Sequence, residues 1–260
     1  MRNLYLYFSG TGNTKYVVDK FSSLFEENEY IKQSIEHENF DYANTIANSE
    51  TIILAYPIHD SMMPFIMIEF LNQYKEAFRD KKLITIAVQM LFSGDGGALA
   101  YRQLKSVGVK LLHSVHINMP NNLTNVFVFK ALPIEKTNHI IIKADKKIKE
   151  VVNKINQGKT LRMGRRFYSR AVGFLTQRGL GKPFMKYARK KLHIYHEKCI
   201  KCKKCIDLCP VNNLYLQDNQ IKTKNLCTLC YRCINACPTQ AISQLGLKPP
   251  KIQYIRKDFN

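Results

Sequence analysis

The chain has 260 residues and is 45% hydrophobic, enough for a substantial core and for two domains. It carries 40 Lys and Arg against 20 Asp and Glu, a net charge of +20. No apolar run is long enough to span a bilayer, and the richest, residues 64–71, is interrupted by Glu69. The first six residues lack the anatomy of a signal peptide. These features argue against a membrane-spanning or secreted protein, and we expect a soluble, cytoplasmic one.

The chain begins with an apolar segment, residues 4–8, that predicts a strand, and a helical pattern starts about six residues later. Glycines and short polar residues fill the turn between them: Ser9, Gly10, Thr11, Gly12, Asn13 and Thr14. Such a turn makes an anion cradle, because glycines let the backbone approach the ligand and the helix N-terminus favours negative charge. Neither a Walker loop nor G-x-G-x-x-G occurs here. The turn therefore predicts a phosphate site of another kind.

Strand and helix patterns alternate further along the chain. Residues 51–56, 83–88 and 109–119 are apolar runs typical of buried strands, and residues 64–78 and 98–107 have helical character. This alternation favours parallel βαβ units.

The turn Ser9-x-Thr11-Gly12-x-Thr14 resembles the phosphate loop of flavodoxins, [ST]-x-T-G-x-T. The resemblance implies an α/β fold, a doubly wound, five-stranded parallel sheet of strand order 2-1-3-4-5. It also implies FMN as the cofactor, bound at the carboxyl ends of the strands. We expect this flavodoxin-like domain to cover residues 1–160.

Two further loops are expected to flank the flavin ring, one after the third strand and one after the fourth. The candidate contacts are Tyr56, Pro57, Ile58, His59 and Asp60 in the second loop and Phe92, Ser93, Gly94, Asp95 and Gly96 in the third. Tyr56, His59 and Phe92 are the candidates for ring contact, although each could equally be a packing residue. Many flavodoxins have a glycine in the second loop, and none lies between Tyr56 and Pro64 here. Asp60 or Ser61 is the residue expected to take a positive φ.

Residues 143–191 carry sixteen Lys or Arg against two acidic residues. The pattern predicts helices over about 143–157 and 165–178, with a break at residues 179–183, and we take residues 161–191 as a basic helical connector. Such a segment could bind nucleic acid, an anionic membrane face or an acidic redox protein. It could also be an interdomain helix that packs its apolar face on protein and keeps its charges in solvent. Because no nucleic-acid-binding motif accompanies the charge, we expect no nucleic acid. We favour an interdomain helix whose charges are solvated and, among the functional interpretations, an acidic redox partner, with peripheral membrane contact left open.

All eight cysteines lie near the C-terminal end, in two copies of the pattern C-x2-C-x2-C-x3-C-P that are offset by 28 residues. In this spacing three thiolates bind one iron-sulfur cluster and the fourth ligates the other cluster. The predicted ligand sets are Cys199, Cys202, Cys205 and Cys237 for one 4Fe-4S cluster and Cys227, Cys230, Cys233 and Cys209 for the other. Structural zinc prefers two well-separated C-x2-C pairs or Cys/His mixtures, and a disulfide framework needs an oxidising compartment, so both alternatives fit less well.

This block resembles bacterial two-cluster ferredoxins over residues 192–245, which implies a small α+β ferredoxin-like domain that we extend to residue 260. Residues 214–216 and 221–222 flank a polar Asp218-Asn219 turn and predict a hairpin. Lysines between the first cysteines should raise the potential of a nearby cluster.

As a whole the chain resembles the fusions of a flavodoxin with a ferredoxin known from anaerobes. The resemblance implies an electron-transfer protein that relays single electrons between two 4Fe-4S clusters and FMN and exchanges them with a redox protein such as a ferredoxin or oxidoreductase. One alternative is an FMN-dependent reductase of a quinone, nitro or azo compound, and a less favoured one is a zinc-stabilised nucleic-acid binder. The sequence leaves open the oligomeric state, the donor and acceptor, and whether the protein is an enzyme. No residue is predicted to be catalytic.

Overall fold

The computed structural model describes residues 3–25, 29–126, 129–130, 132–164 and 179–259. It divides into two compact units. The first comprises Met1–Ser9, Asn13–Met119 and Asn138–Gly179, and the second comprises Gly10–Gly12, Pro120–Thr137 and Leu180–Asn260. The domain boundaries expected from the sequence, after residues 160 and 191, stay a prediction.

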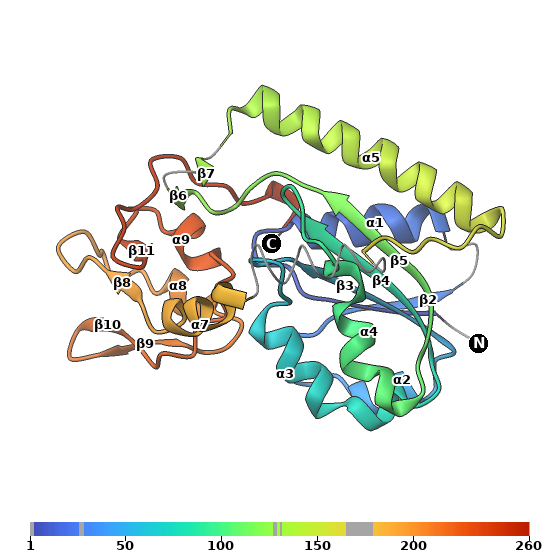
Figure 1. Cartoon of the computed structure of the whole chain (residues 1–260). Helices are drawn as coiled ribbons and strands as arrows, with labels where there is room; N and C mark the ends of the chain where they lie inside the picture. Colours follow the sequence, from blue (N-terminus) through green and yellow to red (C-terminus); the bar gives the residue numbers. More distant parts are fainter. Residues whose placement is uncertain (1–2, 26–28, 127–128, 131, 165–178, 260) are drawn as a thin grey trace. The chain divides into compact units, whose positions relative to one another are not determined.

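The first unit is built on a five-stranded parallel sheet (Figure 1). Its strands are β1 (Asn3–Tyr7), β2 (Tyr30–Ser34), β3 (Thr51–Pro57), β4 (Lys82–Gln89) and β5 (Lys110–Asn118). They pair in the order β2-β1-β3-β4-β5, so the predicted topology is confirmed. Strand β2 was not predicted, because it lies at the edge of the sheet and has no continuous apolar run: its residues are partly polar and at most half-buried.

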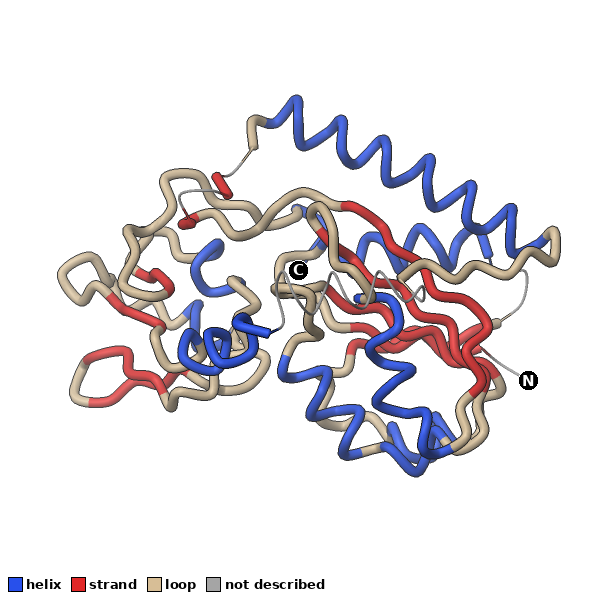
Figure 2. The backbone as a smooth tube through the Cα atoms, viewed as in Figure 1, coloured by secondary structure: helices blue, strands red, loops and turns tan. Residues whose placement is uncertain are grey.

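Helices cover both faces of this sheet (Figure 2). On one face lie α1 (Asn13–Phe25) and α5 (Ile134–Asn156), and on the other α2 (Tyr42–Ala47), α3 (Phe65–Gln73) and α4 (Leu99–Leu104). The core under α1 and α5 joins residues such as Val17, Phe21 and Ile148 to apolar strand residues such as Ile53 and Ile86. The central strands are buried on both faces, which explains why they are nearly continuous hydrophobic runs in the sequence.

Short 3-10 segments extend two of the helices. The predicted helix over 64–78 is α3 followed by a 3-10 turn at Lys75–Phe78, and that over 98–107 is α4 between 3-10 turns at Gly96–Ala98 and Lys105–Val107. The turn at Gly96–Ala98 belongs to the loop that follows β4.

The second unit contains short strand pairs and helices around a small apolar core. Strand β8 (Leu192–Ile194) pairs with β11 (Ile242–Gln244), β9 (Leu214–Gln217) with β10 (Gln220–Thr223), and β6 (Asn125–Val126) with β7 (Phe129–Lys130). Two short helices, α8 (Lys204–Asp207) and α9 (Arg232–Ala236), follow the cysteine loops, and a 3-10 turn (Lys257–Phe259) lies near the C-terminus. The predicted hairpin is confirmed, with Asp218 and Asn219 at φ 49° and 58° in its turn.

The segment before the cysteines differs from expectation. Helix α7 (Gly179–Ala188) runs through the predicted break at residues 179–183, with Pro183 inside it. Pro183 has no amide hydrogen, so the helix loses the one intrahelical hydrogen bond that this residue would donate to the Gly179 carbonyl. Helix α5 begins at Ile134, earlier than expected, and the helix predicted over 165–178 lies outside the described residues. In the described part of the chain no helix has the length and apolar character needed to cross a membrane.

Candidate functional site

The turn between β1 and α1 has the features of an anion cradle. Gly12 has φ 99°, a conformation that side-chain-bearing residues rarely adopt, and the Ser9 hydroxyl accepts a hydrogen bond from the Lys15 amide in the first turn of α1 (3.2 Å). Ser9, Thr11 and Thr14 are all almost completely buried. The turn thus presents its polar groups inward, at the positive end of a thirteen-residue helix.

Two hydroxyls in this turn lack partners. The Oγ1 atoms of Thr11 and Thr14 are buried and make no hydrogen bond. A buried polar group without a partner costs about 1–3 kcal/mol, so such groups point to a ligand. A phosphate supplies the acceptors that both hydroxyls lack, and the phosphate group of FMN therefore fits this turn.

The second loop contains a tight two-residue turn. His59 and Met62 exchange two backbone hydrogen bonds of 2.9 Å, and between them Asp60 and Ser61 have φ 49° and 56°. The expected positive φ thus occurs at both residues, without a glycine. Burial lowers the pKa of His59 to about 4, and its Nδ1 is buried without a partner. Burial also raises the pKa of the Asp60 carboxyl.

Tyr56 acts on the third loop through its hydroxyl. The side chain is fully buried, its hydroxyl donates to the Gly96 carbonyl (2.9 Å), and the Ala100 amide donates to it at 3.4 Å. A fully buried ring has no surface for a flavin to stack on. We therefore assign Tyr56 to positioning the third loop, not to the ring contact considered from its sequence position. Pro57 and Ile58 next to it are half-buried, and the Ile58 amide donates to the Val88 carbonyl (2.8 Å).

Most of the third loop is held by hydrogen bonds to its surroundings. The Gly97 amide donates to His116 Nε2 (2.9 Å), the Gly96 amide donates to the Ser93 carbonyl (3.0 Å), and the buried Asp95 carboxylate pairs with Arg102. The amides of Gly96 and Gly97 are thus engaged and not free to donate to a flavin. Burial lowers the pKa of His116 to about 4, opposed by the nearby Asp95 carboxylate.

Only the start of this loop is open to solvent. Leu91 is 70% exposed and Phe92 53%, whereas Ser93, Gly94, Asp95 and Gly96 are buried. Of the third-loop residues proposed from the sequence, Phe92 is thus the one whose side chain is available for ring contact.

The sequence did not identify His116 as part of this site; it placed Gln89 at the start of the third loop without a role and left Asn118 unassigned. Asn118 donates from Nδ2 to the carbonyls of Met90 (3.0 Å) and Leu91 (2.8 Å), and Gln89 accepts from Ser93. The only sequence signal was their position at the carboxyl ends of β4 and β5.

The second unit reproduces the cysteine repeat in its backbone. Lys201 and Leu229, Lys203 and Tyr231, and Asn212 and Gln240 are pairs 28 residues apart, and all six residues have positive φ. The hydrogen bond from the Asn213 amide to Cys209 Sγ recurs as that from the Ala241 amide to Cys237 Sγ, both at 3.2 Å. The two copies therefore wind their cysteines in the same way.

Two cavities in this unit are each lined by four cysteines. The first cysteine group lines one cavity and consists of Cys199, Cys202, Cys205 and Cys237. The second cysteine group lines the other and consists of Cys209, Cys227, Cys230 and Cys233. Each cavity holds three cysteines from one repeat and the fourth from the other, which is the arrangement expected for two clusters.

The thiol pKa values reflect the same grouping. The pKa of Cys205 is raised to about 12 by burial and then by the charges of Cys237, Cys199 and Cys202. The pKa of Cys227 is raised to about 12 by burial, with Cys230 and Cys209 adding to the shift. Because iron binds thiolates, these crowded thiols would exchange their protons for metal.

All eight cysteines are free of disulfides. Among the described residues no three His, Cys, Asp or Glu side chains are arranged to hold a single metal ion. A 4Fe-4S cluster makes a different demand, because each thiolate binds a different iron and the sulfurs need not converge on one point. Four-thiol cavities therefore suit a cluster.

Two family models match the chain. One described as a flavodoxin domain matches residues 4–127, and one described as a 4Fe-4S dicluster domain matches residues 198–241. The chain joins a flavodoxin domain to a 4Fe-4S dicluster domain. The resemblance to a flavodoxin–ferredoxin fusion inferred from the two motifs is thereby confirmed.

Several solved flavodoxins resemble the chain over their whole length. Fusobacterium nucleatum flavodoxin bound to flavin mononucleotide is 16% identical, with 62% of this chain and 100% of that chain covered and a TM-score of 0.42. Two-electron reduced Megasphaera elsdenii flavodoxin is 16% identical (58% and 98% covered, TM-score 0.41), as is oxidised Flavodoxin 2 from Bacillus cereus (61% and 99%, TM-score 0.43). No curated protein matched the chain.

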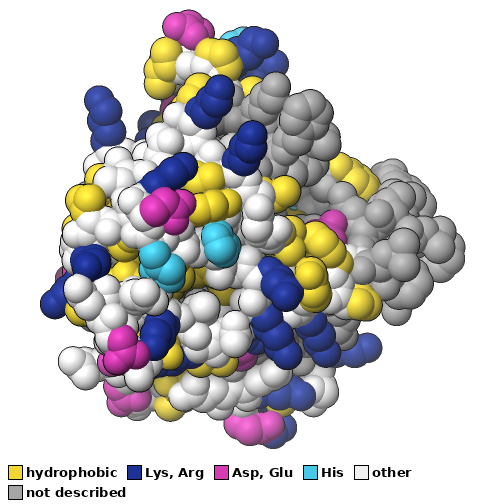
Figure 3. Space-filling model, turned by 90° about the vertical axis from the view of Figure 1, so that its left-hand side faces the viewer, with side chains coloured by type: hydrophobic (Ala, Val, Ile, Leu, Met, Phe, Trp, Pro, Cys, Tyr) yellow, Lys and Arg dark blue, Asp and Glu magenta, His cyan; other side chains and the backbone are white. Residues whose placement is uncertain are grey.

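The two domains together support an electron-transfer role with FMN and iron-sulfur. They also imply a redox partner, because a carrier of this kind must gain and lose its electrons. Lys and Arg side chains are spread over the face of the molecule drawn in Figure 3, with acidic side chains among them.

Proposed function

We propose that this chain is an electron-transfer protein that relays single electrons between two 4Fe-4S clusters and an FMN on the same chain, and exchanges them with an external redox protein. The observation that carries the proposal is the pair of four-cysteine cavities, each completed by a cysteine from the other repeat. They lie in a chain whose flavodoxin domain has a phosphate turn with two unpartnered hydroxyls.

The residues take the following roles in this proposal. The first and second cysteine groups each ligate one cluster, and the turn Ser9–Thr14 binds the FMN phosphate. The second and third loops flank the flavin ring, with Phe92 at its exposed side. A flavin takes up one or two electrons and each cluster one, so the combination connects one-electron and two-electron chemistry.

Carrying all the redox groups on one chain has a kinetic consequence. Transfer between domains that are covalently linked depends on an effective concentration set by the linkage and not on the bulk concentration of protein. A reducing compartment such as the cytoplasm suits this function, because the eight free thiols must stay available for iron.

Cofactor content tests the assignment of the groups. Protein purified or reconstituted without oxygen should contain about eight iron atoms, four for each cluster, and about one FMN per chain. Cys209→Ala should impair the cluster of the second cysteine group and Cys237→Ala that of the first, each leaving the other detectable by electron paramagnetic resonance. Loss of the first group's cluster in Cys209→Ala would contradict the exchange of cysteines.

Rapid kinetics test the relay. After one-electron reduction of the clusters, the FMN should become reduced in a first-order step whose rate constant is independent of protein concentration. A rate constant that rises in proportion to protein concentration would show transfer between molecules and would overturn the single-chain relay.

A second candidate is an FMN-dependent reductase of a small quinone, nitro or azo acceptor, fed through the clusters. The exposed Leu91 and Phe92 and the exposed Asp60 favour it, because they leave part of the loops around the predicted ring site open to a small apolar molecule. Steady-state reduction of a quinone that is slowed by Phe92→Ser, but not by a change at the distant exposed Leu24, would support this reading. Without turnover the candidate falls.

A further inference from the structure

The two copies of the cysteine repeat share a backbone conformation but differ in exposure. In the first copy Lys201 and Lys203 are exposed, whereas their equivalents in the second, Leu229 and Tyr231, are only 5% and 8% exposed. The cysteines follow the same trend, since Cys202 is exposed and its equivalent Cys230 is buried. The first cysteine group is therefore the one that solvent can approach.

The loop around the first cysteine group is strongly basic. Between residues 197 and 204 it carries four exposed lysines against a single acidic residue, Glu197. The equivalent stretch of the second copy, residues 225–232, has no lysine and one arginine, which is buried. Exposed positive charge is therefore found in the first, more exposed copy of the repeat and not in the equivalent stretch of the second copy.

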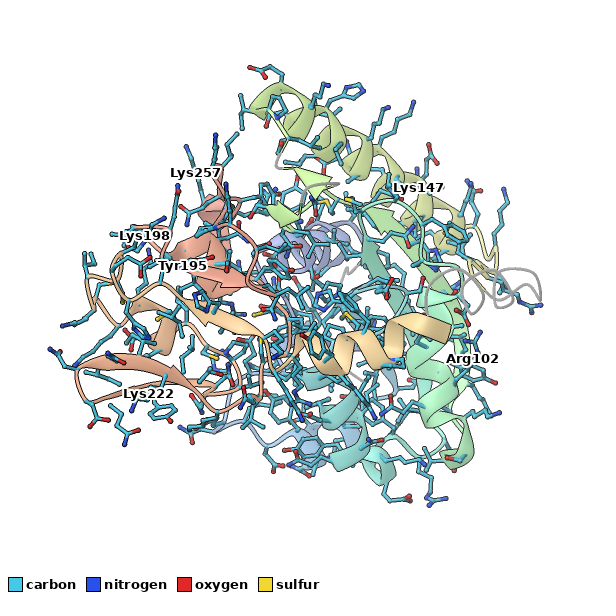
Figure 4. The ribbon with its side chains drawn as sticks, turned by 60° about the vertical axis from the view of Figure 1, so that its left-hand side comes forward. Arg102, Lys147, Tyr195, Lys198, Lys222 and Lys257 are labelled. Atoms are coloured by element: carbon cyan, nitrogen blue, oxygen red, sulfur yellow. The ribbon has the colours of Figure 1, made fainter. Side chains whose placement is uncertain are left out.

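An apolar side chain lies among these lysines. Ile200 is 62% exposed and lines the cavity of the first cysteine group, together with Lys203 and Lys204. At the edge of the loop, Lys198 lies beside Tyr195, with its Nζ 5.4 Å from the ring centroid (Figure 4). An exposed apolar centre with a charged rim is the usual composition of a protein-docking surface.

We propose that the loop Lys198–Lys204 is the docking surface for an acidic redox protein, and that the cluster of the first cysteine group is where electrons enter or leave the chain. The partner is acidic because four lysines steer and orient a negatively charged surface. This inference rests on the proposed function. It adds the place of exchange and the charge of the partner.

The exchange is a single-electron step. One electron leaves a reduced partner, which is oxidised by one, and enters the cluster of the first cysteine group, which is reduced by one. No bond forms or breaks and no proton is required. The reverse direction uses the same surface.

Charge reversal in the full chain tests the surface. The variant Lys201→Glu/Lys203→Glu changes charge at the loop and leaves every cysteine in place. The probe is a photoreduced acidic 2Fe-2S ferredoxin, and the measured quantity is the second-order rate constant of cluster reduction over a range of ionic strength. We expect the variant to react roughly tenfold more slowly at low salt, and the difference from wild type to vanish at high salt.

A matched variant controls for net charge. Lys105→Glu/Lys110→Glu makes the same change at two exposed lysines of the flavodoxin domain. Lys105 lies in the 3-10 turn that precedes β5, and Lys110 is the first residue of β5. This control variant should react at nearly the wild-type rate. Equal slowing in both variants would mean that only net charge matters, and no slowing in either would mean that the partner does not dock here; both results overturn the proposal. A slowing that persists at high salt would point to an altered cluster potential and would also overturn it.

Other measurements separate this test from the proposed function. A neutral reductant, photoreduced 5-deazariboflavin, should reduce both variants at the wild-type rate. The first-order transfer to FMN should be unchanged in Lys201→Glu/Lys203→Glu; if that transfer is missing in the wild type, the relay fails while the docking result stands. Should Lys201→Glu/Lys203→Glu lose iron, Lys198→Glu/Lys204→Glu makes the same test with the same expected outcomes.

Discussion

At the scale of single residues, the turn Ser9–Thr14, the proposed phosphate site, stands out because it buries two hydroxyls that make no hydrogen bond within the protein. Thr11 and Thr14 lie within a few residues of glycines that shape the turn, and their Oγ1 atoms make no hydrogen bond. A group that is costly to bury in the empty protein becomes useful once an anion is bound. Stability and ligand affinity should therefore respond in opposite directions when the hydroxyl is removed.

Thr11→Val tests this opposition. The substitution keeps the shape and removes the unpartnered hydroxyl, so the apoprotein should be as stable as wild type or slightly more stable, while FMN affinity should fall about tenfold. Fluorescence titration with FMN and urea unfolding of the apoprotein measure the two effects. As a control, Thr51→Val should leave FMN affinity unchanged, because Thr51 is the first residue of β3 and the proposed flavin site lies at the carboxyl ends of the strands. Equal affinity in Thr11→Val and wild type would contradict the phosphate assignment.

His116 couples the third loop to pH. Its folded pKa of about 4 lies below the ordinary value of 6.5 because the ring is buried, and its neutral Nε2 accepts from the Gly97 amide. Between these two pH values the unfolded chain binds a proton that the folded chain does not. Its contribution to stability is thus complete above pH 6.5 and is lost as the pH falls towards 4, by about 3 kcal/mol.

Unfolding by urea between pH 4 and pH 7 measures this dependence. His116→Gln should flatten the slope of the unfolding free energy against pH relative to wild type. His139→Gln, on the exposed side of α5, should keep the wild-type slope. The prediction is wrong if the two variants have the same slope.

At the scale of elements, the third loop depends on the strand next to it. Tyr56, near the end of β3, holds the Gly96 carbonyl and the Ala100 amide through one hydroxyl, 40 and 44 residues along the chain. Tyr42 in α2 has a closely similar pair of bonds, donating to the Ser34 carbonyl (2.6 Å) and accepting from the His37 amide (3.2 Å). Both rings are buried, but only that of Tyr56 acts on a loop of the proposed flavin site.

Tyr56→Phe and Tyr42→Phe therefore form a matched pair. Tyr56→Phe should lose about 1 kcal/mol of unfolding free energy, because it removes the side-chain partner of a buried carbonyl and a buried amide. Tyr42→Phe should lose no more than this, because its partners belong to the half-buried Ser34 and the exposed His37. Only Tyr56→Phe should also weaken FMN binding, since it frees the third loop. Calorimetric titration with FMN compares the two variants, and an equal effect on affinity would sink the assignment of Tyr56 as a positioning residue.

At the scale of the whole molecule, residues far apart in sequence meet at Asn235. Its buried amide accepts from the Thr124 hydroxyl (2.9 Å) and the Tyr254 amide (2.8 Å), and donates to the carbonyls of Asn122 and Tyr231 (both 3.0 Å). One side chain thus connects the segment after β5, the second copy of the cysteine repeat and the C-terminal segment that contains Tyr254. All three belong to the second unit.

Asn235→Ala should be strongly destabilising. Loss of four hydrogen bonds and exposure of their partners to an apolar methyl should cost about 3 kcal/mol, measured by anaerobic chemical unfolding followed by circular dichroism. Its repeat equivalent, Asp207, is exposed, so Asp207→Ala should change stability by no more than about 0.5 kcal/mol. Similar losses in both variants would mean that the network around Asn235 adds little.

The amino-acid sequence by itself determined the features that depend on local chemistry. The spacing of the eight cysteines, the phosphate turn from Ser9 to Thr14 and the buried strand runs each lie within a short stretch of chain, and each predicted its fold or domain family. The positive φ at Asp60 was also foreseeable, because few residues other than glycine tolerate it as well.

Only the tertiary structure decided which groups meet across long stretches of chain. No local pattern links His116 to Gly97, Tyr56 to Gly96, or Asn235 to Asn122 and Tyr254, because such contacts arise when elements pack and carry no sequence period. The same holds for the repeat. Its two copies have the same cysteine spacing, so the spacing does not tell which copy is exposed. Packing buries Leu229 and Tyr231 of the second copy and leaves Lys201 and Lys203 of the first in solvent.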